Sequence, residues 1–288
     1  MDTLNLNAGV AGAISDWEIM NVNAGGGNFT ISGAISGAGT LTKSGTGAVT
    51  LSGVNSFTGG TTISSGSLIG GSRSFGTGAI VNNASLVIDQ TTDASFAAAI
   101  SGTGSLTKTG SGTLTLTGVN SFTGGTTISS GSLIGNTQSF GTGNIVNNAS
   151  LVLDQATDAS FAKLISGTGS LTKAGAGAVT LTAINSFSGG TTITSGTLIG
   201  NTQHFCTGEI FNYAWIEFDQ STAGTLGGAI SGTGTLTKTG AGALTLTGAN
   251  SFSGGTTITS GRLIGNTQTL GTGNIVNNSS LVFDQGTA

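Results

Sequence analysis

The chain has 288 residues, of which 53 are glycine and none is proline, and only 6% are charged. A net charge of −4 with seven Lys and Arg residues excludes the basic surface that several phosphate contacts require, so we expect no nucleic-acid partner. No apolar run is long enough to cross a bilayer as a helix, and a single cysteine cannot form an internal disulfide.

The first segment, residues 1–34, precedes the regular part of the chain and is predicted to form a capping segment or first coil. Its start, from Met1 to Leu4, has neither the basic stretch nor the apolar core of a secretory signal peptide. We therefore expect no signal peptide at this end.

From residue 35 the chain repeats itself. The lysine of the string Leu-Thr-Lys recurs at Lys43, Lys108, Lys173 and Lys238, so the period is 65 residues each time (108 − 43 = 65). The units are 35–99, 100–164, 165–229 and 230–288, of which the last is truncated. A fixed period without a helical pattern predicts one continuous domain of stacked repeats.

Each unit contains short alternating segments separated by glycine. In the second unit, residues 100–121, 122–143 and 144–164 each have the length of one solenoid coil, so the sequence predicts three coils per unit. Leu114 and Leu116 would point inward and the threonines between them outward. A helix is disfavoured, because each glycine costs it roughly 1 kcal/mol relative to alanine. The predicted fold class is an all-β solenoid.

The run from 232 to 258, GTGTLTKTGAGALTLTGANSFSGGTTI, has copies that begin near Gly37, Gly102 and Gly167. It resembles the passenger-associated repeat of bacterial autotransporters, and the resemblance covers about residues 35–288. It implies a right-handed parallel β-helix at the outer surface of a bacterium, an extracellular adhesin or stalk. The repeat itself implies a scaffold that is not an enzyme.

The family's translocator barrel has no counterpart in this sequence, so we expect an excised or engineered segment that is produced in the cytoplasm. The last strand, around residues 281–283, would leave an open coil edge and invite end-to-end self-association.

The third unit differs from the others. The single His, Cys and Tyr of the chain, His204, Cys206 and Tyr213, lie within ten residues, followed by Trp215. Against residues 144–153 of the second unit, the drastic changes in 209–218 fall at alternate positions, which predicts that the solvent face was rewritten. A smaller residue in the next coil, Leu226 in place of Phe161, suggests a shallow groove.

Two kinds of site are compatible with this window. His204, Cys206 and Glu209 offer a thiol, an imidazole and a carboxylate, the logic of a cysteine hydrolase acting on activated esters. The same three residue types could hold a metal ion, although their spacing matches no strong zinc motif. We expect no cofactor for this protein.

The favoured interpretation is a binding patch. Phe211, Tyr213, Trp215 and Glu217 would present aromatic rings and an acid to a protein, a peptide, a glycan or a small aromatic ligand, since aromatic side chains concentrate interface energy. The sequence therefore predicts a non-catalytic β-solenoid scaffold with one recognition patch, which the pattern of changes suggests was engineered.

Overall fold

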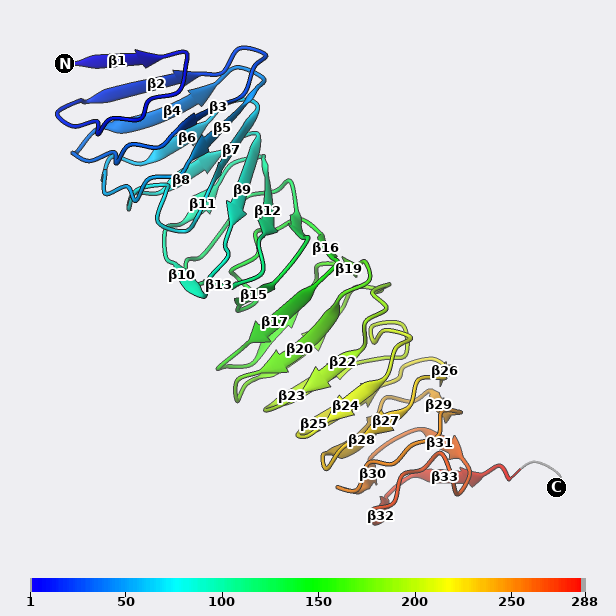
Figure 1. Ribbon diagram of the computed structural model, residues 1–288. Coiled ribbons are helices and arrows are strands. Elements are labelled where there is room, and N and C mark those ends of the chain that lie inside the picture. Colours follow the sequence, from blue (N-terminus) through cyan, green and yellow to red (C-terminus); the bar gives the residue numbers. More distant parts are fainter. Residues whose placement is uncertain (1, 286–288) are drawn as a thin grey trace. The chain divides into compact units, whose positions relative to one another are not determined.

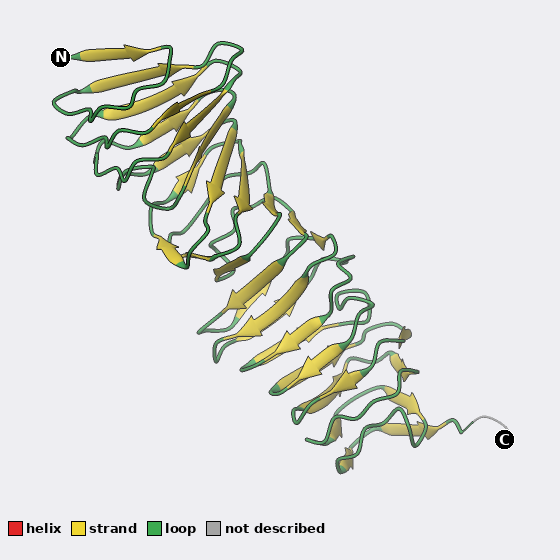
Figure 2. Ribbon diagram, in the orientation of Figure 1, coloured by secondary structure: helices red, strands yellow, loops and turns green. Residues whose placement is uncertain are grey.

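The computed structural model describes residues 2–285, and these residues form strands joined by turns and loops, with no helix (Figure 2). The strands stack in parallel as a β-solenoid, which confirms the predicted fold class. No helix of the described part is therefore long and apolar enough to cross a membrane. The chain divides into two compact units, residues 1–149 and residues 150–288, and each is described by itself.

The first unit contains sixteen strands (Figure 1). They are β1 (Thr3–Leu6), β2 (Ile19–Asn23), β3 (Phe29–Ile31), β4 (Thr40–Ser44), β5 (Ala48–Leu51), β6 (Thr61–Ile63), β7 (Ser67–Gly70), β8 (Ile80–Asn82), β9 (Ser85–Asp89), β10 (Ala94–Phe96), β11 (Ile100–Ser101), β12 (Ser105–Thr109), β13 (Thr113–Leu116), β14 (Thr126–Ile128), β15 (Ser132–Gly135) and β16 (Ile145–Asn147).

The second unit repeats the same succession of short strands. They are β17 (Ser150–Asp154), β18 (Ala159–Phe161), β19 (Ile165–Ser166), β20 (Ser170–Ala174), β21 (Ala178–Leu181), β22 (Thr191–Ile193), β23 (Thr197–Gly200), β24 (Ile210–Asn212), β25 (Trp215–Asp219), β26 (Gly224–Leu226), β27 (Ile230–Ser231), β28 (Thr235–Thr239), β29 (Ala243–Leu246), β30 (Thr256–Ile258), β31 (Arg262–Gly265), β32 (Ile275–Asn277) and β33 (Ser280–Phe283).

One coil is slightly shorter than a third of the repeat. Leu86 pairs with Leu106, an advance of 20 residues (106 − 86 = 20), and Ser67 pairs with Ser85, an advance of 18 (85 − 67 = 18). About three coils per repeat is therefore correct. Three such coils still leave several of the 65 residues over, so the repeat and the coil are out of step.

This mismatch moves equivalent strands onto different sheets. In the first unit, β1, β2, β4, β6, β8 and β11 form one sheet, β3, β5, β7, β9, β12, β14 and β16 a second, and β10, β13 and β15 a third. Strand β5 lies in the second sheet, whereas its equivalent one repeat later, β13, lies in the third. The second unit behaves in the same way, since β21 and its equivalent β29 lie in different sheets. A new sheet begins close to the point where an earlier one ends: β10 begins a sheet and β11 ends one, and β26 and β27 do the same.

The interior of each unit is filled by the inward-pointing side chains of the strands and by phenylalanines from the loops. Leu106, Leu114 and Phe122 are completely buried, and Leu116 is 2% exposed, so the alternation of the sequence correctly predicted that Leu114 and Leu116 point inward. The last coil differs, because Phe283 is 57% exposed although its counterpart Phe218 is buried. Self-association at this end remains a prediction.

The four lysines of the Leu-Thr-Lys strings lie in this interior, and their side chains are fully buried. In the first unit, Lys108 Nζ donates hydrogen bonds to the carbonyls of Thr109 (2.6 Å), Gly110 (2.8 Å) and Ser130 (3.2 Å). An ammonium group has three protons, so every donor is satisfied. Lys43, Lys173 and Lys238 each make the equivalent three bonds.

A glycine makes room for each ammonium group. Gly131 has a φ of +70°, and a Cβ atom there would lie 2.5 Å from the carbonyl oxygen of Gly110 and 2.9 Å from Lys108 Nζ. Any other residue would collide with the backbone it borders. Burial lowers the pKa of Lys108, while the carboxylate of Asp89 acts in the opposite direction.

The lysine bonds predict a large stability effect. Lys108→Met keeps most of the aliphatic stem but removes the ammonium, which leaves three carbonyl oxygens without this donor. We expect the free energy of unfolding to fall by about 3 kcal/mol or more. The urea midpoint measures it, with Thr107→Ala on the outer face of the same strand as the control. Equal midpoints for the two variants would contradict the role assigned to the ammonium.

Candidate functional site

Two strands of the third repeat position the aromatic residues. On β24 the side chains of Ile210 and Asn212 are buried, and on β25 that of Ile216 is buried. Between them Phe211 is 38% exposed, and Trp215 is 55% exposed. The prediction that the rewritten positions face the solvent is confirmed for the aromatic residues, because the inward positions of both strands stay buried while the rings are exposed.

The aromatic residues do not all lie on one sheet. Strand β24 pairs with β22 and β27, whereas β25 pairs with β23 and β28 in a different sheet. Tyr213, 53% exposed, lies at the corner between them, where Asn212 Oδ1 accepts the Ala214 N–H at 3.2 Å. The three rings therefore follow a bend in the chain and form a convex aromatic corner (Phe211, Tyr213 and Trp215).

Two acids flank the aromatic corner. Glu209 is exposed just before β24, and Glu217 is half-buried on β25. Glu217 Oε1 accepts a hydrogen bond from the Thr239 hydroxyl at 2.8 Å, which fixes one of its carboxylate oxygens against the neighbouring strand β28. The corner thus has a polar, negatively charged border on both sides.

His204 replaces a hydroxyl that other repeats use inside a turn. Its Nδ1 accepts the Asn201 N–H at 3.3 Å. In the second repeat Ser139 Oγ accepts the equivalent N–H, from Asn136, at 3.2 Å. Desolvation by burial lowers the pKa of His204, and the carboxylate of Asp219 opposes this shift. The unprotonated ring nitrogen therefore has a structural partner already.

Cys206 stands where the other repeats have a glycine. Its side chain is only 1% exposed, and its Sγ lies 3.5 Å from the Thr191 hydroxyl. The corresponding Gly141 has a φ of +69°, but among the described residues Asp16 is the only residue other than glycine with a positive φ, so Cys206 adopts a different backbone conformation. The thiol faces the interior of the solenoid.

The structure does not bring the proposed catalytic residues together. Cys206 is buried, His204 is half-buried and bonded to its own turn, and Glu209 is exposed. Within the described part of the chain, no hydrogen bond joins any two of these three side chains, and no three His, Cys, Asp or Glu residues are placed to hold a metal ion. Activation of a thiol needs its base within hydrogen-bond reach.

The expected groove beside the patch is a rearrangement of the core instead. Phe218 replaces Leu153 and Leu226 replaces Phe161, and both new side chains are buried. The ring of Phe218 packs edge to face against Phe205, with centroids 4.9 Å apart. The aromatic ring has moved from one inward position to another, so the exchange does not hollow the surface.

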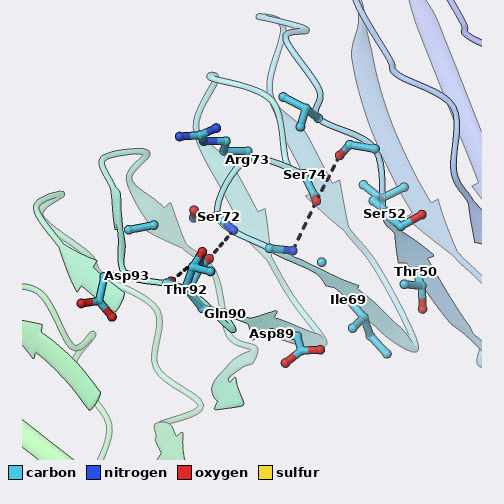
Figure 3. A pocket seen from close by; sticks show the side chains of 16 residues that line it. Thr50, Ser52, Ile69, Ser72, Arg73, Ser74, Asp89, Gln90, Thr92 and Asp93 are labelled. Atoms are coloured by element: carbon cyan, nitrogen blue, oxygen red, sulfur yellow. Dashed lines mark hydrogen bonds between the residues drawn. The ribbon is translucent and has the colours of Figure 1, made fainter. Parts of the chain in front are cut away.

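A second local deviation lies in the first repeat and was not recognised in the sequence. Gly71 and Arg73 occupy the positions held by Asn136 and Gln138 in the second repeat. They border a cleft of about 380 Å³ (Figure 3). Both differences, Gly71 and Arg73, can be found in the sequence by aligning the four repeats with one another.

The fold and the 65-residue period define a parallel β-solenoid built of sequence repeats. The family model of the passenger-associated-transport-repeat matches residues 41–69, 106–134, 171–199 and 236–264, so the chain carries four passenger-associated-transport-repeats, one in each period. No curated protein and no solved structure matches the chain.

Burial of Cys206 predicts a protected thiol. We expect iodoacetamide to alkylate the native protein at least about a hundredfold more slowly than the chain in urea, since reaction requires local opening. Cys206→Gly/Thr207→Cys restores the repeat glycine and places a thiol at an exposed neighbouring position, so it should react at the rate of a free thiol. A native Cys206 that reacts as fast as this control would reopen the hydrolase hypothesis.

The His204 turn predicts a dependence of stability on pH. Because the folded-state pKa is lowered from about 6.5, the unfolded chain binds the proton first as the pH falls. The contribution of the neutral ring is present above about pH 6.5 and is lost as the pH falls through the lower folded-state value. Thermal midpoints of the wild type relative to His204→Ser should therefore decrease between about pH 7.5 and pH 5. A constant difference would rule out the accepting role of Nδ1.

Proposed function

We propose that this protein is a surface-displayed adhesive scaffold whose third repeat recognises a basic partner through the aromatic corner. Its passenger repeats and its solenoid fit a non-catalytic autotransporter passenger scaffold. The observation that carries the recognition role is the exposure of Phe211, Tyr213 and Trp215 in one repeat, while the inward positions of the same strands stay buried.

Exposed aromatic rings are costly to leave in water and valuable in an interface. The corresponding residues of the second repeat are Val146, Asn148 and Ser150, of which Val146 has an exposure of 41%. The third repeat therefore adds large apolar rings without any gain in core packing. Aromatic side chains contribute a disproportionate share of binding energy at interfaces.

The charge around the corner selects the partner. Glu209 and Glu217 stand where the second repeat has Asn144 and Val152, so the same changes that added rings added two negative charges. Lysine and arginine side chains stack on aromatic faces and pair with carboxylates. A protein or peptide segment that carries arginine fits this combination better than a glycan or an acidic surface.

Display at the outer surface of a bacterium follows the family of the repeat and is part of the proposal. A rigid solenoid holds its outward side chains on strands that are paired on both sides, as β25 is paired with β23 and β28. A recognition surface on such strands is ordered before the partner arrives, which reduces the entropic cost of binding.

The chain itself supplies the variants that test this proposal. Phe211→Val/Tyr213→Asn/Trp215→Ser restores the second-repeat residues and should fold, because none of the three is buried. With an arginine-glycine hexapeptide as the probe, we expect a saturable change in tryptophan fluorescence in the wild type. Trp17 is 5% exposed, so the response can be assigned to Trp215.

The controls separate charge from stacking. Glu209→Asn/Glu217→Val should weaken binding of the peptide by about tenfold and lower its dependence on salt. A hexapeptide with glutamate in place of arginine, and a linear oligosaccharide, should leave the fluorescence unchanged. Binding of the oligosaccharide alone would overturn the choice of a basic partner, and an unchanged affinity in the triple variant would overturn the site.

A further inference from the structure

The first repeat contains a cleft that is lined by one basic and two acidic side chains, Arg73, Asp89 and Asp93. Its volume is about 380 Å³, within the range of small-molecule sites, and it is bordered by strands β5, β7 and β9. In Figure 3, Arg73 lies in the upper part of the view above Ser72, while Asp93 lies at the left and Asp89 below. Between them the lining is mainly serine, threonine and backbone groups.

The turn that contains Arg73 differs from the equivalent turn of every other repeat. There an asparagine side chain accepts the backbone N–H two residues later, as Asn136 Oδ1 does from Gln138 at 2.9 Å. Asn201 and Asn266 make the same bond. Gly71 has no such side chain, and no residue in the described part of the chain accepts the Arg73 N–H.

The turn nevertheless keeps its shape. Ser74 N–H donates to the carbonyl of Gly71 at 2.9 Å, and Gly71 N–H donates to Ser74 Oγ at 3.2 Å. A Cβ atom at Gly71 would have its nearest neighbours, in Asp89 and Gln90, at 3.7 and 3.8 Å, which is ordinary contact. The absence of a side chain at residue 71 is therefore not required by packing, and it leaves the space of a carboxamide open beside a backbone donor.

The same two changes supply a cation. Arg73 replaces the glutamine of the other repeats, and its side chain is exposed. A carboxylate has the shape of the carboxamide that Gly71 lacks, and it can accept from the Arg73 N–H and from the guanidinium together. The equivalent depression in the fourth repeat, which Asn266 lines, measures about 140 Å³.

The two aspartates are held in place by hydrogen bonds from the next coil. Asp93 Oδ1 accepts the Thr113 N–H at 2.8 Å, and Asp89 Oδ1 accepts the Thr109 hydroxyl at 3.1 Å. The bond from Thr113 lowers the pKa of Asp93, so this carboxyl is ionised at neutral pH. These two carboxylates repel polyanions and attract an ammonium group.

We propose that this cleft binds a short zwitterion, a free amino acid or a dipeptide, with its carboxylate on the Arg73 amide and guanidinium and its ammonium toward Asp89 and Asp93. The site is independent of the aromatic corner, since it uses another repeat and other chemistry. Nutrient or peptide sensing by a displayed scaffold would require a site of this kind.

Glycylglycine is the probe, and the amide resonance of Arg73 in a nitrogen-15 NMR spectrum is the readout. We expect saturable shifts of Arg73 and its neighbours in the wild type. Gly71→Asn and Arg73→Gln each restore the residue of the other three repeats, so both should fold with an unchanged circular dichroism spectrum. Each variant should weaken binding by about tenfold or more, the cost of a charge-assisted hydrogen bond.

Two analogues test the ends separately. N-acetylglycylglycine lacks the ammonium, and glycylglycine amide lacks the carboxylate, and both should bind at least about tenfold more weakly than glycylglycine. Equal binding of the acetylated analogue would overturn the role of Asp89 and Asp93 and with it the zwitterion. Unchanged affinity in both folded variants, or no saturable shift in the wild type, would overturn the site.

Discussion

The structure depends on an ammonium group placed where a turn meets the next coil of the solenoid. A coil of about 20 residues must turn repeatedly, and the carbonyl oxygens of a turn have no partner within a strand ladder. Lys108 Nζ collects three of them, two from its own turn and one, that of Ser130, from the next coil. The bond to Ser130 ties successive coils together along the axis of stacking. Buried charges are tolerated only when their hydrogen bonds are complete, and here the three protons and three acceptors match.

The same interaction explains why the third repeat could change so much without losing its fold. Lys173 and Lys238, the lysines before and after the altered window, keep their full sets of carbonyl partners. Between these two lysines, an aromatic and an aliphatic side chain have exchanged inward positions, and the new residues Phe218 and Leu226 are both buried. Volume-conserving exchanges of this type cost little stability. The outward positions had no packing to preserve and were free to acquire rings and acids.

Much of this could be predicted from the sequence, and the remainder has identifiable physical causes. Alternation along β24 and β25 correctly placed Phe211 and Trp215 outside, because each strand has one obligatory buried face. It could not show that the Asn212 corner carries the chain from one sheet to the next, since that depends on pairing between distant segments. The burial of Cys206 could not be predicted from alternation, because Cys206 lies in a turn whose backbone conformation differs from that of the equivalent glycine. Burial of the lysines was not predicted, although Leu106 and Lys108 have the same parity on their strand and both point inward.

The mismatch between coil and repeat has a consequence for what such a protein can present. In each unit an equivalent strand of the next repeat belongs to another sheet, so identical side chains in successive repeats project in different directions. A regular lattice, such as an ice surface or a periodic polymer, would therefore find no long array of matching threonines. Instead, within a unit, mutation of one copy of the repeat changes the side chains of one sheet and leaves the equivalent side chains of the next copy unchanged. Duplication of such a repeat within a unit therefore lengthens the solenoid and also presents the same side chains on another sheet.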